Sequence, residues 1–476
     1  MKNYNQIKAE QLNQKLQEFC VPLARTSMHG GWTSQWTFIT AAIGATIGLG
    51  NLWKFAYLAG ANGGAGFVLM YLLCMALVAT PVLVAEIIIG SRGRGDPVHA
   101  IASISLESAL SRHWRWIGVI SCIAALLVLS YLSVIGGWLL TYSSWLYHGD
   151  LSAASARQVG ELFGQLLGDG AHQAGAQALF LLVAWMVVAQ GVTRGLGMLF
   201  MVLAPLLLVL LLFMVLTALR MGDMAAAVQF MFALRLDEWH GEGALAALGQ
   251  AFFSLGVGMG AMISFGAYAP ERRSLLRSLG TVVLVHVLVA LLAGLAIFPL
   301  VFAHRVQPNF GPGLMFVTLP YIFGNLPYGG VIGTAFFVMT LLAAFGSAVA
   351  LLEPATAWLV QAKRWSRPRA ALLLVVVVWL LGLLSIGSFS MWPNWRPGGK
   401  SLFAWIDWLS ADVLLPICAL AIAIFVGWRM RGESIRDELR TQRPRLFWFW
   451  RFLLRYIAPP AIAIILLVGI ARLWSV

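Results

Sequence analysis

Long apolar stretches separated by short polar segments run through most of this chain. Eleven of them come near the ~20 residues that an α-helix needs to cross a bilayer. They lie at residues 36–60, 64–90, 114–147, 176–192, 194–218, 245–268, 279–303, 331–362, 369–389, 402–428 and 449–474. The pattern predicts an all-α protein that crosses a membrane eleven times.

Composition agrees with this interpretation and excludes other classes. The chain has 476 residues, of which 60% are hydrophobic and 11% are charged, so a soluble globular protein is excluded. The net charge of +13 does not point to nucleic acid, because the basic residues cluster in alternate loops. Of the 32 lysines and arginines, 24 fall on one side, which the positive-inside rule makes cytoplasmic. We therefore expect a cytoplasmic N-terminus and an outside C-terminus.

Glycine clusters interrupt the first and the sixth predicted helices. The clusters are GATIGLGN at residues 44–51 and SLGVGMG at residues 254–260. Each glycine costs a helix about 1 kcal/mol relative to alanine, and unwound backbone at membrane depth is tolerated only in a protein interior or beside a polar cavity. A single glycine could serve close helix packing instead. Two clusters at corresponding places favour broken helices around a binding site.

The position of the breaks predicts the domain organisation. The first five helices carry a break in their first member, and the next five do the same, which is the pattern of an inverted repeat. We expect a cytoplasmic arm at residues 1–35, a ten-helix core at 36–428, a cytoplasmic loop at 429–448 and an eleventh helix at 449–476. The outer loop at 312–326 is long enough to fold over an outer vestibule.

Several motifs resemble the neurotransmitter:sodium symporter family. The segment 44–90 carries GLGN, WKF, NGG and Glu86, and further matches are QAFFS at 250–254, LLEP at 351–354, Asp407 and LP at 415–416. The resemblance covers nearly all of residues 32–475. It implies a five-plus-five inverted-repeat transporter with broken first and sixth helices plus one extra helix. The eleven-helix plan is similar to that of bacterial members, which implies the bacterial inner membrane.

By this resemblance the protein is a secondary active transporter, not an enzyme, that imports a neutral amino acid or related small amine by sodium symport. The substrate site would be formed by Thr46, Gly48, Leu49, Gly50, Val128, Leu132, Phe253, Ser254, Gly256, Met259, Ser347 and Leu351. Exposed amide N–H groups of a broken helix favour a carboxylate, and free carbonyls favour an ammonium group. The apolar residues among these positions favour an apolar side chain.

Two sodium sites are also implied, and both depart from the family pattern. The second sodium site would use Gly44, Ile47, Ala343, Gly346 and Ser347, where glycine at 346 removes one side-chain ligand. The first sodium site would use Thr46, Asn51, Ser254 and His286, where the family has an asparagine or aspartate in place of the histidine. Sodium prefers oxygen ligands, so imidazole is a poor replacement. We expect one Na⁺ at the second site, leave the first open, and expect no organic cofactor.

Two substitutions in the implied site leave alternatives open. His286 lies deep in a predicted helix, where it is either a proton carrier or a neutral hydrogen-bonding group. Leu132 replaces a tyrosine that would bind the substrate carboxylate. Either the backbone and the Thr46 hydroxyl hold the carboxylate, which we favour, or the substrate is not an ordinary α-amino acid.

The implied gates are altered as well. Lys54 and Asp407 match the outer ion pair, although lysine gives a point charge where arginine gives a bidentate fork. Trp32 matches the tryptophan of the family's inner gate. The two positions where the family has an arginine and an aspartate, which form an inner ion pair, are His29 and Gln361 here. Closure on the inner side must therefore rest on other residues.

Other functions and partners follow from the same residues. Proton-coupled transport through His286, or exchange, is the alternative within this fold. A ligand sensor that does not transport is the alternative of another class. The expected partners are an amino-acid-like substrate and the lipid bilayer, with no nucleic acid, and a homo-oligomer is left open. Cys20, Cys74, Cys122 and Cys418 predict no disulfide and no metal cluster.

Overall fold

Helices make up the regular structure of this protein. The structure, a computed structural model, describes residue 27 and residues 29–235, 241–270, 275–305, 313–439 and 444–471. Within those ranges the only β-contact is an isolated bridge between Gly64 and Leu234. Most of the predicted N-terminal arm, and Cys20 with it, lies outside the described residues.

Nine helices in the described ranges are long and apolar enough to cross a membrane. They are Ala65–Gly93, Arg112–His148, Gly170–Ala189, Val192–Met221, Leu275–Ala303, Gly329–Lys363, Arg367–Gly387, Leu402–Arg429 and Pro444–Ala471. The first and sixth predicted helices are absent from this set because each is divided into shorter pieces. Together they account for the eleven predicted crossings.

The helices fall into two halves, one extra segment and connecting elements. The first half contains α2 (Gln35–Thr46), η1 (Gly50–Lys54), α3 (Phe55–Ala61), α4 (Ala65–Cys74), η2 (Met75–Ala79), α5 (Thr80–Gly93), α7 (Trp116–His148), α9 (Gly170–Ala189), η4 (Val192–Gly197) and α10 (Met198–Met221). The second half contains α12 (Gly241–Ser254), α13 (Ala261–Ala267), α14 (Leu275–Ala303), α16 (Gly329–Lys363), α17 (Arg367–Gly387), α18 (Leu402–Asp407), η7 (Trp408–Leu414), α19 (Leu415–Ile424) and η8 (Phe425–Arg429). The extra segment is α21 (Pro444–Phe452), η9 (Leu453–Ile457) and α22 (Ala458–Ala471). The connecting elements are α6 (Pro97–Glu107), η3 (Arg112–Arg115), α8 (Ala156–Gly168), α11 (Met224–Phe232), η5 (Leu314–Thr318), α15 (Leu319–Gly324), η6 (Pro397–Gly399) and α20 (Gly432–Leu439).

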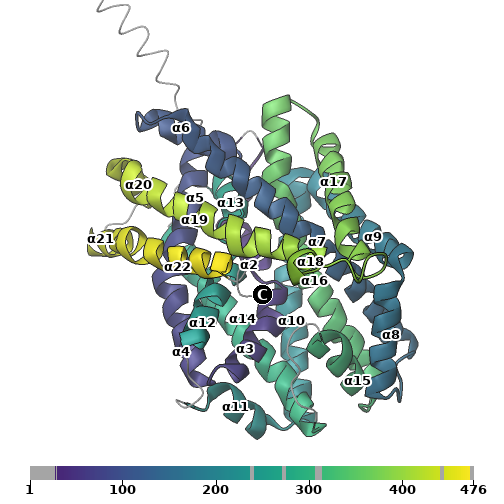
Figure 1. The fold of residues 1–476 in the computed structure, drawn as a ribbon. Coiled ribbons are helices and arrows are strands. Elements are labelled where there is room, and N and C mark those ends of the chain that lie inside the picture. The colour runs from purple at the N-terminus through teal and green to yellow at the C-terminus, as the bar shows by residue number, and fades with distance from the viewer. Residues whose placement is uncertain are drawn as a thin grey trace, which may run out of the picture.

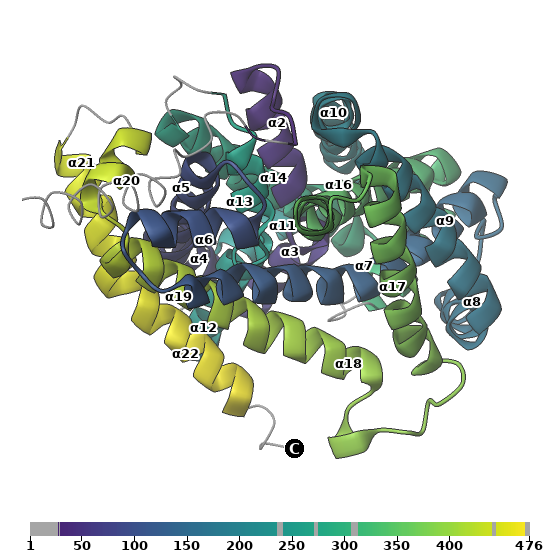
Figure 2. The ribbon, with the colours of Figure 1, turned by 90° about the horizontal axis from the view of Figure 1, so that it is seen from above.

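Equivalent helices of the two halves make equivalent contacts, each with the broken helix of the other half. Helix α5 of the first half packs against α13 of the second, and its counterpart α14 packs against α2 and η1 of the first. The long third and eighth helices, α7 and α16, lie against each other in the middle of the molecule (Figures 1 and 2). This reciprocal packing is that of a five-plus-five inverted repeat, which confirms the predicted fold class, with α21–α22 as the additional crossing.

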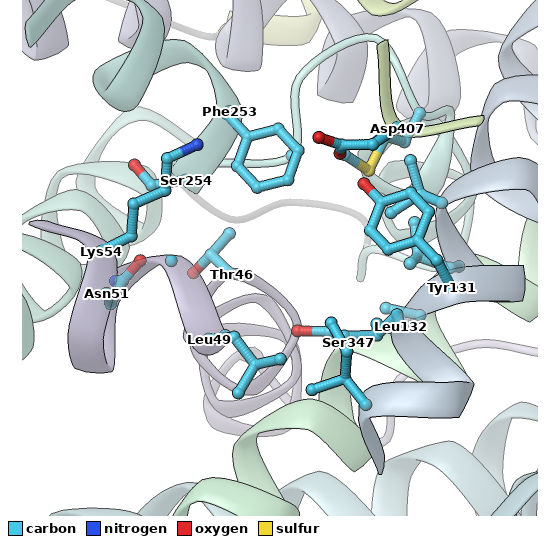
Figure 3. Close-up of a pocket in the computed structure, with 18 of the residues that line it drawn as sticks. Thr46, Leu49, Asn51, Lys54, Tyr131, Leu132, Phe253, Ser254, Ser347 and Asp407 are labelled. Atoms are coloured by element: carbon cyan, nitrogen blue, oxygen red, sulfur yellow. The ribbon is translucent and has the colours of Figure 1, made fainter. Parts of the chain in front are cut away.

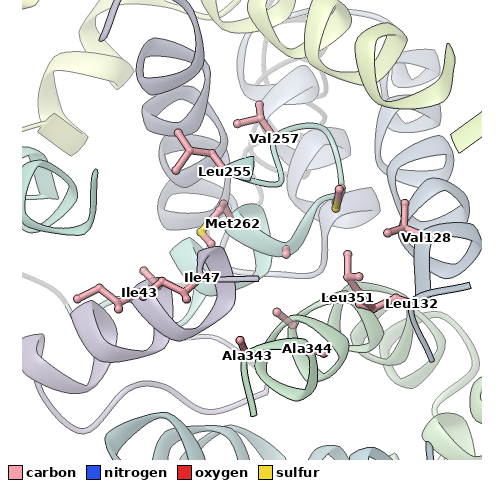
Figure 4. Packing of buried hydrophobic residues seen from close by; sticks show 14 of the residues in the cluster. Ile43, Ile47, Val128, Leu132, Leu255, Val257, Met262, Ala343, Ala344 and Leu351 are labelled. Atoms are coloured by element: carbon pink, nitrogen blue, oxygen red, sulfur yellow. The ribbon is translucent and has the colours of Figure 1, made fainter. Parts of the chain in front are cut away.

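The apolar core is centred on the two broken helices. Figure 4 shows Ile43 in α2 and Ile47 of the first break on one side of Met262, and Leu255 and Val257 of the second break on its other side, with Leu351 of α16 nearby. All six side chains are buried. By contrast, outward-facing positions of α10 are apolar and exposed, as expected of a surface in contact with lipid. The breaks are therefore held inside protein and do not face the membrane.

Some boundaries differ from the sequence-based ones. The last crossing begins at Pro444, where 449 was expected, and α20 occupies part of the predicted 429–448 loop. Proline is well suited to the first position of a helix, because it has no N–H to leave unpaired there. The aromatic residues that follow then extend the helix towards the membrane interface.

Candidate functional site

The two glycine clusters are real interruptions of the backbone. Helix α2 ends at Thr46, and Ile47 is extended, with φ −79° and ψ 106°. Helix α12 ends at Ser254 and α13 begins only at Ala261. A broken helix leaves backbone carbonyl and N–H groups without their usual helical partners, so both breaks offer polar backbone to a ligand.

Glycine has a different function in each break. In the sixth-helix break Gly256, Gly258 and Gly260 have φ values of +66°, +94° and +73°, a region that other residues rarely adopt. In the first break the requirement is space, because a Cβ on Gly48 would lie 2.8 Å from the Ser347 hydroxyl oxygen. Glycine is thus required in the second half by the backbone conformation of the break, and in the first half by the close approach of α16.

Glu86 on α5 of the first half forms a hydrogen bond with the unwound segment between α12 and α13. Its Oε1 accepts a hydrogen bond of 2.6 Å from the backbone N–H of Gly258, and its side chain is fully buried. Because the segment around Gly258 has no helical partner for that N–H, the carboxyl group replaces one. Glu86 is thus a structural support of the site.

A single cavity of about 480 Å³ lies between the two breaks, α7 and α16 (Figure 3). Every residue of the substrate site implied by the sequence lines it: Thr46, Gly48, Leu49, Gly50, Val128, Leu132, Phe253, Ser254, Gly256, Met259, Ser347 and Leu351. Four separate segments of the chain converge here. The folded protein therefore brings all these positions together around one cavity.

The cavity also has residues that the sequence did not reveal. Phe163 of α8, Met315 and Phe316 of η5, and Phe389 and Phe403 near α18 line its outer part. The predicted fold of the 312–326 loop over the vestibule agrees with the position of η5. Phe163 lies on the connecting helix α8, Phe389 follows the end of α17, and Phe403 lies in the first turn of α18, where no periodic pattern indicates which face meets a cavity.

The polar end of the cavity corrects one expectation about Thr46. Its hydroxyl donates to the carbonyl oxygen of Ala42 at 2.9 Å, with Ile43 O at 3.2 Å as a second acceptor. In this conformation the hydroxyl proton is therefore used within α2. Neither Thr46 nor Leu132 then turns a free hydroxyl donor towards the cavity. Backbone N–H groups of the broken first helix remain.

The residues of the second sodium site lie together. The Ser347 hydroxyl of α16 faces Gly48, and a Cβ on Gly346 would lie 2.6 Å from the carbonyl oxygen of Gly44. The end of α2 leaves the carbonyls of its last turn without helical partners. Backbone carbonyls and one hydroxyl are the oxygen ligands that a hard cation prefers, so these residues fit sodium.

The residues of the first sodium site are bonded to one another. His286 is fully buried on α14, and the amide nitrogen of Asn51 lies 3.1 Å from its Nδ1 and 3.3 Å from its Nε2. Its Nε2 also lies 3.1 Å from the Ser254 hydroxyl, and a backbone hydrogen bond joins the imidazole to Thr46. The imidazole thus contacts all three other members of the site.

The outer gate residues stand apart. Lys54 and Asp407 both line the cavity and lie on opposite sides of it in Figure 3. The Lys54 Nζ lies 5.1 Å from the centre of the Phe253 ring. Asp407 lies beside Tyr131 in the same view. The outer side of the cavity is therefore not closed by the predicted ion pair in this conformation.

The residues predicted for the inner gate, Trp32 and the pair of His29 and Gln361, each have a partner. The Trp32 ring nitrogen donates to Phe265 O at 3.0 Å, and its ring packs edge-on against Phe265 and Tyr268. His29 Nε2 lies 3.4 Å from Gln361 Oε1. The two residues that replace the expected inner ion pair therefore still meet, without charge on the glutamine.

A buried ion pair lies next to this neutral contact. Glu353 of α16 is bonded to Arg367 of α17, and Tyr268 donates to the other carboxylate oxygen at 2.5 Å. The Arg367 Nε donates to Val188 O at 2.8 Å. These residues link α13, α16, α17 and α9. Their closeness to His29 makes them candidates for the other residues of the predicted inner gate.

Fold, broken helices and cavity together define a multi-pass membrane transporter, and comparisons with known proteins agree. The model of the sodium:neurotransmitter symporter family matches residues 29–159 and 156–475. The chain is 36% identical to an uncharacterized sodium-dependent transporter of Bacillus subtilis, YhdH, over 92% of this chain and 96% of that one. It is also 28% identical to the mouse sodium-dependent neutral amino acid transporter B(0)AT2, over 50% of this chain and 36% of that one.

A solved structure shows the same fold. The crystal structure of MhsT in complex with L-phenylalanine matches with a TM-score of 0.85 and 36% identity, covering 92% of this chain and 99% of that one. The chain belongs to the sodium:neurotransmitter symporter family of sodium-dependent transporters, which confirms the resemblance found in the sequence.

Proposed function

We propose that this protein imports a neutral amino acid with an apolar side chain, by sodium-coupled symport across the bacterial inner membrane. The observation that carries the proposal is the cavity between the two broken helices. Val128, Met259 and Leu351 give it a buried apolar wall, whereas the helix breaks give it polar backbone. An α-amino acid has the same division between an apolar side chain and a charged backbone group.

The size of the cavity supports a large side chain. Its volume of about 480 Å³ lies within the range of small-molecule sites, and Gly256 leaves part of the wall without a side chain. MhsT, with the same fold, was crystallised with L-phenylalanine. We therefore infer that bulky apolar amino acids are preferred over glycine or alanine.

Sodium enters the proposal through the second sodium site. Carbonyl oxygens of α2 and the Ser347 hydroxyl of α16 come from helices of the two different halves. An ion between them would join α2 to α16 and so favour one arrangement of the two halves. Differential binding of this kind is what allows an ion to drive a conformational cycle.

Uptake into proteoliposomes tests the function. An inward sodium gradient should drive accumulation of a bulky apolar amino acid above its outside concentration, and choline in place of sodium should abolish it. Ser347→Ala should weaken the response to sodium, whereas Gly280→Ala, a change into open space on α14, should not. Binding without accumulation would indicate a sensor, and accumulation driven by a pH gradient in choline would indicate proton coupling.

A further inference from the structure

His286 occupies a position that a family of sodium-coupled transporters would use for an ion. It lies on α14 next to η1 and the end of α12, fully buried. The three residues that would share an ion with it, Thr46, Asn51 and Ser254, all contact its imidazole. The question is whether this group of residues can hold sodium at all.

The hydrogen bonds determine the form of the imidazole. The Asn51 amide nitrogen is a donor only and lies 3.1 Å from Nδ1 and 3.3 Å from Nε2, so the ring nitrogen that it bonds carries no proton. We assign the nearer nitrogen, Nδ1, as the acceptor. The proton is then on Nε2, which lies 3.1 Å from the Ser254 hydroxyl oxygen and can donate to it. A neutral imidazole has one lone pair, and Asn51 occupies it.

The remaining donors do not make a cation site. The side-chain amide of Asn51 lies with one end 3.1 Å from the imidazole, so in either orientation of the amide one of its two polar atoms is used by His286. In this structure the other atom, Oδ1, is buried without a hydrogen-bond partner among the described residues. The Ser254 hydroxyl and the Thr46 backbone carbonyl are the two acceptors for the one ring N–H of His286. A hard cation requires several oxygen ligands together, and a single free carbonyl oxygen does not provide them. The first sodium site therefore does not fit sodium.

We propose that the His286 imidazole permanently takes the place of the first sodium ion, so that each substrate is coupled to a single sodium ion at the second sodium site. The imidazole crosslinks the broken first helix, the end of α12 and α14 by hydrogen bonds, as an ion would do by coordination. The proposal rests on the proposed sodium-coupled function and adds its stoichiometry.

Counting bound sodium tests the proposal directly. Purified protein is equilibrated with radioactive sodium and a saturating amino acid that has passed the uptake test, and bound ions are counted per bound substrate. We expect one ion in the unchanged protein and two in His286→Asn, which supplies an amide oxygen. His304→Asn, just beyond the end of the same helix, is the matched control and should keep one ion.

A zero-flux measurement gives the same answer without a variant. In proteoliposomes at zero membrane potential, one coupled ion lets a sodium gradient of about tenfold balance an opposing substrate gradient of about tenfold, whereas two ions balance about a hundredfold. Two ions in the unchanged protein, by either method, would overturn the proposal. One ion in a folded His286→Asn variant would show that the imidazole is not what closes the site.

Failure of the underlying function gives a different result. If no sodium is bound and no gradient balances substrate flux, the sodium-coupled transport itself is wrong. If sodium is bound and transport occurs with two ions, only the assignment of His286 is wrong. The two measurements therefore separate the stoichiometry from the function.

Discussion

Single residue replacements distinguish the two predicted sodium sites and the predicted carboxylate contact of this transporter from the family pattern. At the second sodium site, glycine at 346 first appeared as the loss of a ligand. The structure gives it a packing reason, since a Cβ there would lie 2.6 Å from the Gly44 carbonyl oxygen. The helices α2 and α16 approach closely at this point, and the residue is small because of that approach.

Gly346→Ser should therefore weaken sodium binding, although it adds a hydroxyl of the kind a sodium site uses. The extra atoms have to push α16 away from Gly44, and overpacking of this type costs about 1–3 kcal/mol. The sodium concentration that gives half-maximal substrate binding should rise. Gly280→Ser, where a Cβ meets open space, should leave it unchanged. Tighter sodium binding in Gly346→Ser would show that the helices can adjust.

For the proposed amino-acid substrate, Leu132 removes the tyrosine hydroxyl that would bind the carboxylate. Because the Thr46 hydroxyl donates within α2, the carboxylate has neither of the two side-chain hydroxyls considered from the sequence. Leu132→Tyr should restore a donor facing the cavity. A hydrogen bond to a charged group is worth about 1.5–3 kcal/mol, which corresponds to roughly ten- to hundredfold tighter binding.

The matched variant for this change is Leu132→Phe, which adds the ring without the hydroxyl. Binding of an amino acid by the two variants can be compared by calorimetry, and again with the corresponding amine that lacks a carboxyl group. Only the tyrosine variant should bind the amino acid more tightly, and the amine should show no difference. Equal affinities for the amino acid would indicate a substrate that places no carboxylate at this position.

At the scale of elements, buried polar side chains join helices and support the unwound segments between them. Glu86 supports the unwound segment around Gly258, and Glu353 with Arg367 joins α16 to α17 beside Tyr268. Such groups are expensive to bury unless each is paired. The pairing of Glu353 with Arg367 explains why these two charged residues occur within apolar helices.

Arg367→Met should lower the thermal stability of the purified protein strongly, because it leaves the Glu353 carboxylate buried without its cation. Breaking a buried pair in this way costs about 3–5 kcal/mol. Arg157→Met on α8 breaks the exposed pair with Glu161 and should cost about 0–1 kcal/mol. Replacing both Glu353 and Arg367 by Gln and Met should recover much of the loss. A small effect of the single change would mean that water reaches Glu353.

The whole molecule places these elements in one state of a transport cycle. At the predicted inner gate Trp32 is bonded to Phe265, whereas Lys54 and Asp407 of the predicted outer gate lie on opposite sides of the cavity. In alternating access, substrate binding should bring the outer residues together. Transport then depends on the movement of one half of the repeat relative to the other, not on any one side chain.

Chemical labelling can follow that movement. A cysteine introduced as Asp407→Cys, in a background without Cys20 and Cys74, should react with a thiol reagent that does not cross the membrane. Sodium together with substrate should slow the reaction severalfold, because the outer cavity closes, whereas sodium alone should not. An unchanged rate with bound substrate would contradict closure at this position.

The sequence by itself determined much of the architecture, because the features concerned depend on residues that are neighbours in the chain. Apolar length predicts membrane crossings because the bilayer has a fixed thickness, and the two glycine clusters predict the breaks because glycine weakens a helix. Family motifs on those same helices predicted the positions that line the cavity, from Thr46 to Leu351. These features depend on residues close together in the chain.

Only the tertiary structure decided what depends on two distant segments meeting. The bonding of His286 to Asn51 and Ser254, the contact of Gly346 with Gly44, and the inward use of the Thr46 hydroxyl concern distance and direction between atoms. A sequence lists donors and acceptors but does not say which pair is formed. For this transporter that choice governs how many sodium sites remain, because oxygen ligands already bonded to an imidazole are not available to an ion.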